Sequence, residues 1–120
     1  MDLTFSEQDR AFQQDVREWL SQAWPQEMRD KQARSALGKL SKDDLVGWQK
    51  RLAEKGWAGA NWPKEHGGAA FTPTQNYIFD LERARVGAPG VVPFGMSMVA
   101  PVIMKFGTEE QKSNFLPKIL

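Results

Sequence analysis

The stretch FGTEEQKSNFLPKIL at residues 106–120 shows most clearly how this protein folds. Thr108 stands three residues before Gln111, so its hydroxyl can accept from the third amide of a helix while the glutamine side chain reaches back. Glu109 and Glu110 fall in the first turn, where carboxylates interact favourably with the helix dipole. The apolar positions of the last turns are Phe115, Leu116, Ile119 and Leu120. The stretch therefore predicts an amphipathic helix that begins after Thr108.

The same start signal occurs at residues 72–75, and residues 6–9 and 41–44 carry a related one, with an aspartate in place of the glutamine. Each signal is followed by apolar residues at helical spacing, which predicts helices over about 6–24, 41–56 and 72–87. A more polar helix is expected over about 25–36, between a proline and a glycine. Four such signals, each followed by helical periodicity, favour a helical protein.

Residues 94–106 form the most apolar stretch of the chain. Phe94, Met98, Val102 and Phe106 recur at steps of four, and the intervening residues are also largely apolar. A helix that is hydrophobic nearly all round is normally buried, so we expect this one to be central. Pro101 should kink it, because proline removes one backbone hydrogen bond.

No stretch alternates with period two for long enough to suggest a sheet. The predicted fold is therefore all-α, a helical bundle of five or six helices. The one long irregular stretch lies at residues 56–71, where Trp57 and Trp62 flank a small-residue turn. Two large aromatic side chains at these positions should pin the loop onto the rest of the protein.

Composition excludes several classes of function. The 120 residues contain no cysteine and one histidine, which excludes disulfides, thiolate nucleophiles, iron–sulfur clusters and multi-histidine metal sites. A net charge of +1 disfavours a nucleic-acid-binding protein. Residues 86–104 carry no charge, but their prolines and glycines argue against a membrane span. The simplest expectation is a cytoplasmic protein.

Candidates for catalysis are few. His66 follows Trp62-Pro63-Lys64-Glu65, and neighbouring Glu65 is poorly placed to orient it as a general base. Gly67-Gly68 matches neither common phosphate-binding loop. We therefore assign no catalytic, cofactor-binding or metal-binding residue within the chain. Composition and spacing alone indicate a helical domain with an anchored loop and reveal no activity.

Several motifs, however, resemble those of acyl-CoA dehydrogenases. The run Trp62-Pro63-Lys64-Glu65-His66-Gly67-Gly68 looks like the Pro-x-x-x-Gly-Gly segment after the family's third helix, and residues 81–89 resemble its next helix and Gly-Ala-Pro exit. Phe106-Gly107-Thr108-Glu109-Glu110-Gln111-Lys112, leading to Leu116-Pro117, is close to a family signature. The resemblance covers essentially all 120 residues. The sequence most resembles the large-subunit bacterial enzymes of this family that act on dicarboxylic or bulky, ring-containing acyl chains.

The resemblance implies that residues 1–120 are the N-terminal helical domain of a flavoprotein. Family members oxidise an acyl-CoA to the 2,3-enoyl-CoA with FAD, and pass electrons to an electron-transfer flavoprotein or similar acceptor. The flavin-cradling β-domain and the C-terminal helical domain of the family are absent from this sequence, and so is the catalytic glutamate. The fragment is therefore expected to bind no FAD by itself. A homo- or hetero-oligomer is also expected.

In the family, one helix of the N-terminal domain lines the acyl-chain pocket. Carried onto this sequence, that helix covers residues 94–106, and Phe94, Ser97 and Met98 are the substrate-binding candidates. For each of these residues, plain core packing remains the competing interpretation. The alternative function is a free-standing helical interaction module without catalytic activity.

Overall fold

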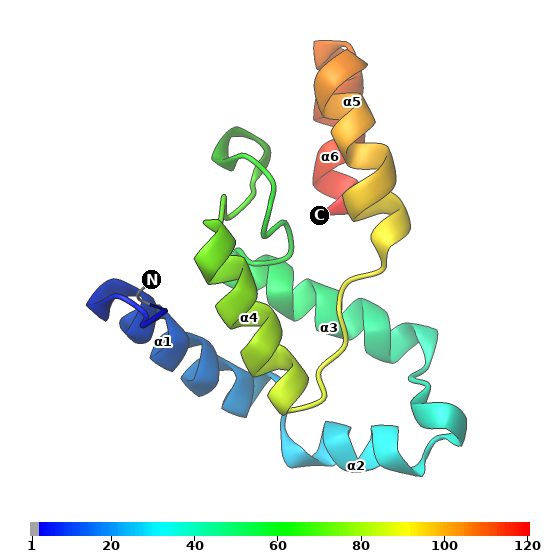
Figure 1. Cartoon of the computed structure of the whole chain (residues 1–120). Coiled ribbons are helices and arrows are strands. Elements are labelled where there is room, and N and C mark those ends of the chain that lie inside the picture. The colour runs from blue at the N-terminus through cyan, green and yellow to red at the C-terminus, as the bar shows by residue number, and fades with distance from the viewer. Residues whose placement is uncertain (1–2) are drawn as a thin grey trace. The chain divides into compact units, whose positions relative to one another are not determined.

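The computed structural model describes residues 3–120, which contain six α-helices and no strand (Figure 1). The α-helices are α1 (Glu7–Ala23), α2 (Gln26–Arg34), α3 (Lys42–Lys55), α4 (Pro73–Arg85), α5 (Ala100–Phe106) and α6 (Glu109–Ile119). Three short segments join them: the 3-10 turns η1 (Ala36–Gly38) and η2 (Lys64–His66), and the π-helical η3 (Phe94–Val99). The predicted all-α class is confirmed. Within the described range, no helix combines the length and apolarity needed to cross a membrane.

The predicted helix starts are confirmed at the level of hydrogen bonds. The Thr72 hydroxyl accepts from the Gln75 amide at 3.1 Å, and the Gln75 side chain accepts from the Thr72 amide at 2.9 Å. Thr108 and Gln111 form the same reciprocal pair at the start of α6. The Ser6 hydroxyl accepts from the Asp9 amide at the start of α1, and the Ser41 hydroxyl accepts from the Asp44 amide at the start of α3. The sequence pattern predicted these helix starts because each contact joins residues only three positions apart.

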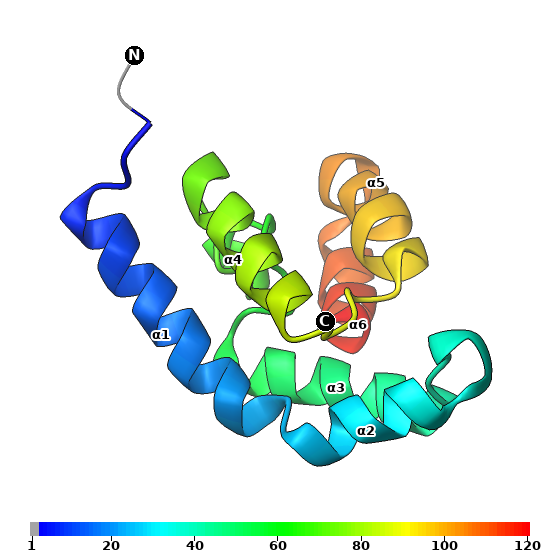
Figure 2. The ribbon, with the colours of Figure 1, turned by 60° about the horizontal axis from the view of Figure 1, so that its bottom comes forward.

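The chain divides into two compact units, and the first comprises residues 3–45 and 71–89. In this unit α1 packs along α4, and the two helices lie side by side in Figures 1 and 2. The Phe71 ring stacks edge-on against Phe12, with ring centroids 5.1 Å apart, and contacts Phe79 at 5.9 Å. The buried apolar side chains of the unit are Val16, Leu20, Trp24, Ile78, Phe79 and Ala88.

The second unit comprises residues 46–70 and 90–120, in which α5 packs against α6 and η3. The Gln49 amide nitrogen donates to the carbonyl of Ile119 at 2.9 Å, tying α3 to the end of α6. Trp57 and Trp62 are 9% and 5% exposed, which confirms that they anchor the irregular loop. The buried apolar side chains here are Trp48, Leu52, Trp57, Ala58, Trp62, Met96, Ala100 and Leu116.

The expectation that residues 94–106 form a central, buried helix is wrong for the described chain. Phe94, Met98, Val102 and Phe106 are 67%, 59%, 56% and 75% exposed. The buried residues of this segment are instead Met96 and Ala100, which are four positions apart and out of step with the predicted row. The segment is apolar on two sides, and this chain covers only one of them. Next to Pro101, where a kink is predicted, the helix changes from the π-helical η3 to the α-helical α5.

Candidate functional site

The candidate site is the segment η3, whose unusual geometry follows from Pro101. In this π-helical segment the amide of Ala100 donates to the carbonyl of Gly95, five residues earlier. The next amide in the same register would belong to residue 101, but proline has no N–H group. The carbonyl of Met96 is thereby left without its backbone donor. A buried carbonyl without a partner would be costly, so another donor is needed.

Trp62 supplies that donor from the anchored loop. Its indole Nε1 donates to the carbonyl oxygen of Met96 at 2.9 Å, in a buried position. Gly95 lies so close to α6 that a Cβ there would be 3.0 Å from the Ile119 side chain. The loop and α6 thus both contact η3. Pi-helical turns are frequent at functional sites, and this one coincides with the three predicted substrate-binding residues.

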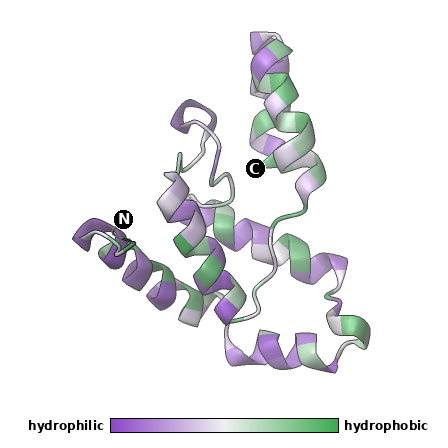
Figure 3. Cartoon of the chain, viewed as in Figure 1, coloured by the Kyte–Doolittle hydropathy of each residue, from purple (hydrophilic) through white to green (hydrophobic). Residues whose placement is uncertain are grey.

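Phe94, Ser97 and Met98 all lie on η3 and are all exposed. The exposure argues against core packing of these side chains within the described chain. They continue into an exposed apolar face, defined here as Phe94, Met98, Val99, Val102 and Phe106. In Figure 3, hydrophobic positions (green) occur along η3 and α5 among paler and more polar ones. The face offers apolar contact and a flexible methionine thioether, which suits an aliphatic or ring-containing ligand. Contact with substrate stays a prediction.

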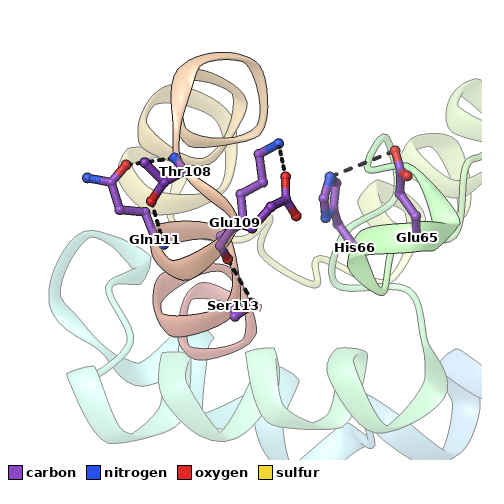
Figure 4. A network of polar contacts seen from close by, with 7 residues as sticks. Glu65, His66, Thr108, Glu109, Gln111 and Ser113 are labelled. Atoms are coloured by element: carbon purple, nitrogen blue, oxygen red, sulfur yellow. Dashed lines mark hydrogen bonds and ion pairs between the residues drawn. The ribbon is translucent and has the colours of Figure 1, made fainter.

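A second feature of this unit is a cavity of about 550 Å³ between η2 and α6. Figure 4 shows His66 facing Glu65, with Nε2 and Oε1 3.8 Å apart, too far for a hydrogen bond. Lys112 pairs with Glu109 at 3.1 Å, one turn apart on the α6 wall of the cavity. At this distance Glu65 does not orient His66 as a general base requires. No group of three potential metal-ligating side chains occurs in residues 3–120.

The structure also brings together a polar cluster around Glu82 that sequence reasoning missed. Glu82 on α4 is 1% exposed, and its carboxylate accepts from Arg17 Nε at 2.8 Å and from Gln13 at 2.7 Å. Burial by itself raises the pKa of Glu82, but these hydrogen bonds and the charges of Arg17 and Arg85 outweigh it and lower the pKa. A carboxylate held ionised in this way is unsuited to act as a base near neutral pH. One signal was available: Glu82 follows buried Ile78 by four residues, on the same helix face.

Comparison with known proteins places the chain in a family. Residues 6–120 match the family model described as acyl-CoA dehydrogenase, N-terminal domain. The chain belongs to the acyl-CoA dehydrogenase family, as an N-terminal domain. It is 32% identical to acyl-CoA dehydrogenase FadE26 of Mycobacterium tuberculosis over 99% of its own length and 30% of the relative. It is 34% identical to acyl-CoA dehydrogenase IpdE1 of Mycolicibacterium smegmatis, over 91% of the chain and 29% of the relative.

Solved structures agree with this assignment. The ChsE4-ChsE5 complex from Mycobacterium tuberculosis matches with a TM-score of 0.77 and 30% identity, over 99% of this chain and 29% of that one. The structure titled Tcur3481-Tcur3483 steroid ACAD matches with a TM-score of 0.77 and 31% identity, over 99% and 30%. The chain thus spans about a third of the length of these relatives.

Proposed function

We propose that this chain is the N-terminal part of an FAD-dependent acyl-CoA dehydrogenase and that η3 contributes one wall of its acyl-chain pocket. The proposal depends on one observation: the segment that the family resemblance assigns to substrate presents Phe94 and Met98 to the outside, 67% and 59% exposed. A side chain that served only the core of this domain would be buried. Ser97, exposed beside them, adds a hydroxyl to an otherwise apolar wall.

The residues present do not fit a flavin site. Gly67-Gly68 is the nearest approach to a nucleotide-binding loop, but its inner space is already filled. A Cβ on Gly68 would lie 2.0 Å from the Trp62 carbonyl oxygen, so this glycine accommodates the protein's own backbone. FAD would therefore be held by parts of the enzyme outside residues 1–120. No step of the reaction is assigned to a residue of this chain.

The proposed substrates are CoA thioesters of bulky, ring-containing acyl chains. One matched structure is named a steroid ACAD, which supports a ring-containing substrate. Another is the ChsE4-ChsE5 complex, which supports a hetero-oligomer. We further propose that the complete enzyme is cytoplasmic and passes electrons to an electron-transfer flavoprotein or similar acceptor.

The test is an assay of the full-length enzyme. Dye reduction should depend on an acyl-CoA, with a higher kcat/KM for a ring-bearing acyl chain than for a linear one. The isolated 120-residue chain should be colourless after purification, and a yellow preparation that retains FAD would contradict the assignment of the flavin to other domains. Absence of acyl-CoA-dependent reduction in a flavin-loaded, full-length enzyme would refute the proposal.

The alternative, a helical interaction module without catalysis, is separated from the enzyme by the coding sequence itself. A flavin-cradling β-domain encoded soon after Leu120 decides for the enzyme. A stop codon at that point, together with a well-behaved monomer, decides for the module.

A further inference from the structure

The first compact unit contains a cavity that the proposed dehydrogenase function does not use. It has a volume of about 220 Å³ and is lined by α1, α2 and α4. One water molecule takes up about 30 Å³ in the liquid, so the cavity has room for a small ion with several waters. Its charged lining consists of Arg17, Arg29, Glu82 and Arg85.

These four groups carry an excess of positive charge. Three guanidinium groups face one carboxylate, which leaves two positive charges uncompensated in the lining. Arg17 uses only Nε for Glu82, at 2.8 Å, and its two terminal nitrogens bond to no residue in the described range. Arg85 lies farther away, with Nε 3.9 Å from the Glu82 carboxylate, and is 58% exposed. The guanidinium groups of Arg17 and Arg85 therefore still have N–H groups that can donate to a ligand.

Arg29 supplies the second, independent observation. Its Nε is buried and has no hydrogen-bond partner among the residues that the structure describes. A buried charged donor without an acceptor is costly, and in native proteins such a group usually points to a missing water or ion. Arg29 lines the same cavity as the two guanidinium forks. Within the described residues, the Glu82 carboxylate accepts from Arg17 and Gln13, and the buried Arg29 Nε still has no acceptor.

We propose that this cavity binds a phosphate group, either as inorganic phosphate or as the terminal group of a phosphate monoester, between Arg17, Arg29 and Arg85. A phosphate group carries about two negative charges near neutral pH, which matches the excess charge of the lining. Its oxygens can accept from several guanidinium forks at once, as arginine does in bidentate phosphate recognition. Glu82 holds Arg17 in place and contributes no bond to the ligand.

The test is a titration of the 120-residue chain followed by NMR at the arginine Nε–H groups, at constant ionic strength maintained with sodium chloride. Inorganic phosphate and phenyl phosphate are the two probes, and acetate is the monoanionic comparison. We expect the Arg29 Nε–H signal to shift saturably with a phosphate probe and much less with acetate. Saturation by both probes indicates a site for free phosphate, and saturation by phenyl phosphate alone indicates a site for a monoester.

Variants distinguish specific phosphate binding in this cavity from a general effect of ionic strength. Arg29→Gln should weaken phosphate binding about tenfold, because one charge-assisted donor is lost. Arg85→Gln should weaken it similarly, and thermal unfolding checks that this variant, at a side chain 58% exposed, remains folded. Arg10→Gln removes an exposed arginine from α1, the helix that carries Arg17; it is the matched control and should leave affinity within twofold. Equal effects of all three variants, or shifts that follow ionic strength alone, would overturn the proposal.

Discussion

At the scale of single residues, Glu82 shows how a buried charge contributes to stability. Its carboxylate is held by Arg17 and Gln13, and its pKa lies below its ordinary value of 4.5 despite burial. A depressed carboxyl pKa means that the folded state favours the ionised form. The resulting stabilisation is fully present above about pH 4.5 and is lost as the pH falls through the folded-state pKa.

Glu82→Gln should therefore lower the free energy of unfolding at pH 7 by about 2 kcal/mol, the usual value for hydrogen bonds to a charged group. It should also flatten the loss of stability between about pH 5 and pH 3. Arg17→Met should be more destabilising at pH 7, because it leaves the buried carboxylate without its main partner. Urea unfolding at several pH values measures both effects. A variant with the same acid sensitivity as the wild type would show that Glu82 does not cause it.

Replacing glycine by alanine should have opposite effects on stability at two positions, Gly68 and Gly47. Gly68→Ala should destabilise the protein by about 3 kcal/mol, because the new Cβ would lie 2.0 Å from the Trp62 carbonyl oxygen. Gly47→Ala, inside α3, should stabilise it by about 0.5–1 kcal/mol, since its Cβ would meet nothing within 4 Å. Thermal unfolding of the two variants checks the pair. A Gly68→Ala variant as stable as the wild type would contradict the packing described for the loop.

At the scale of elements, the π-helical η3 depends on two residues outside it. Pro101 removes an amide that would have reached the Met96 carbonyl, and Trp62 replaces it with an indole N–H at 2.9 Å. Trp62→Phe should cost about 1–3 kcal/mol, because a buried carbonyl loses its donor while most of the ring remains. Pro101→Ala restores an amide and should recover part of this loss.

A double-mutant cycle measures this coupling directly. Pro101→Ala should be more favourable in the Trp62→Phe background than in the wild type, by about 1 kcal/mol. Urea unfolding of the four proteins gives the coupling free energy. Additive effects would mean that Trp62 supports η3 through packing alone.

The helix starts could be predicted because Thr72, Thr108, Ser6 and Ser41 bond to residues three positions away. The π-helical register could not, since the decisive donor lies 34 residues before its acceptor. Glu82 was missed for the same reason, as its partners are 65 and 69 residues distant in sequence. Apolarity at residues 94–106 predicts a buried surface, yet Phe94, Met98, Val102 and Phe106 are exposed in the described chain. Apolarity does not say whether the cover for such a surface belongs to the same chain.

At the scale of the whole molecule, the exposed apolar face of η3 and α5 should affect solution behaviour. We expect the 13.6 kDa chain to self-associate, because uncovered apolar surface favours contact between copies. Val102→Lys should reduce the association, since Val102 is 56% exposed on that face. Val46→Lys on α3, at a site 43% exposed, is the matched control and should change little. Light scattering across a concentration series measures the effect, and a concentration-independent monomer would contradict it.

The central claim, that η3 lines the acyl-chain pocket, is tested most directly by Met98→Trp in the full-length enzyme. The larger ring should narrow the pocket and shift the ratio of kcat/KM for bulky against short acyl-CoA by about tenfold towards the short substrate. Val46→Trp provides the control for adding a tryptophan at an exposed apolar position. A changed ratio at unchanged thermal stability is the expected result. An equal loss of activity on all acyl chains, or no change in the ratio, would contradict the account.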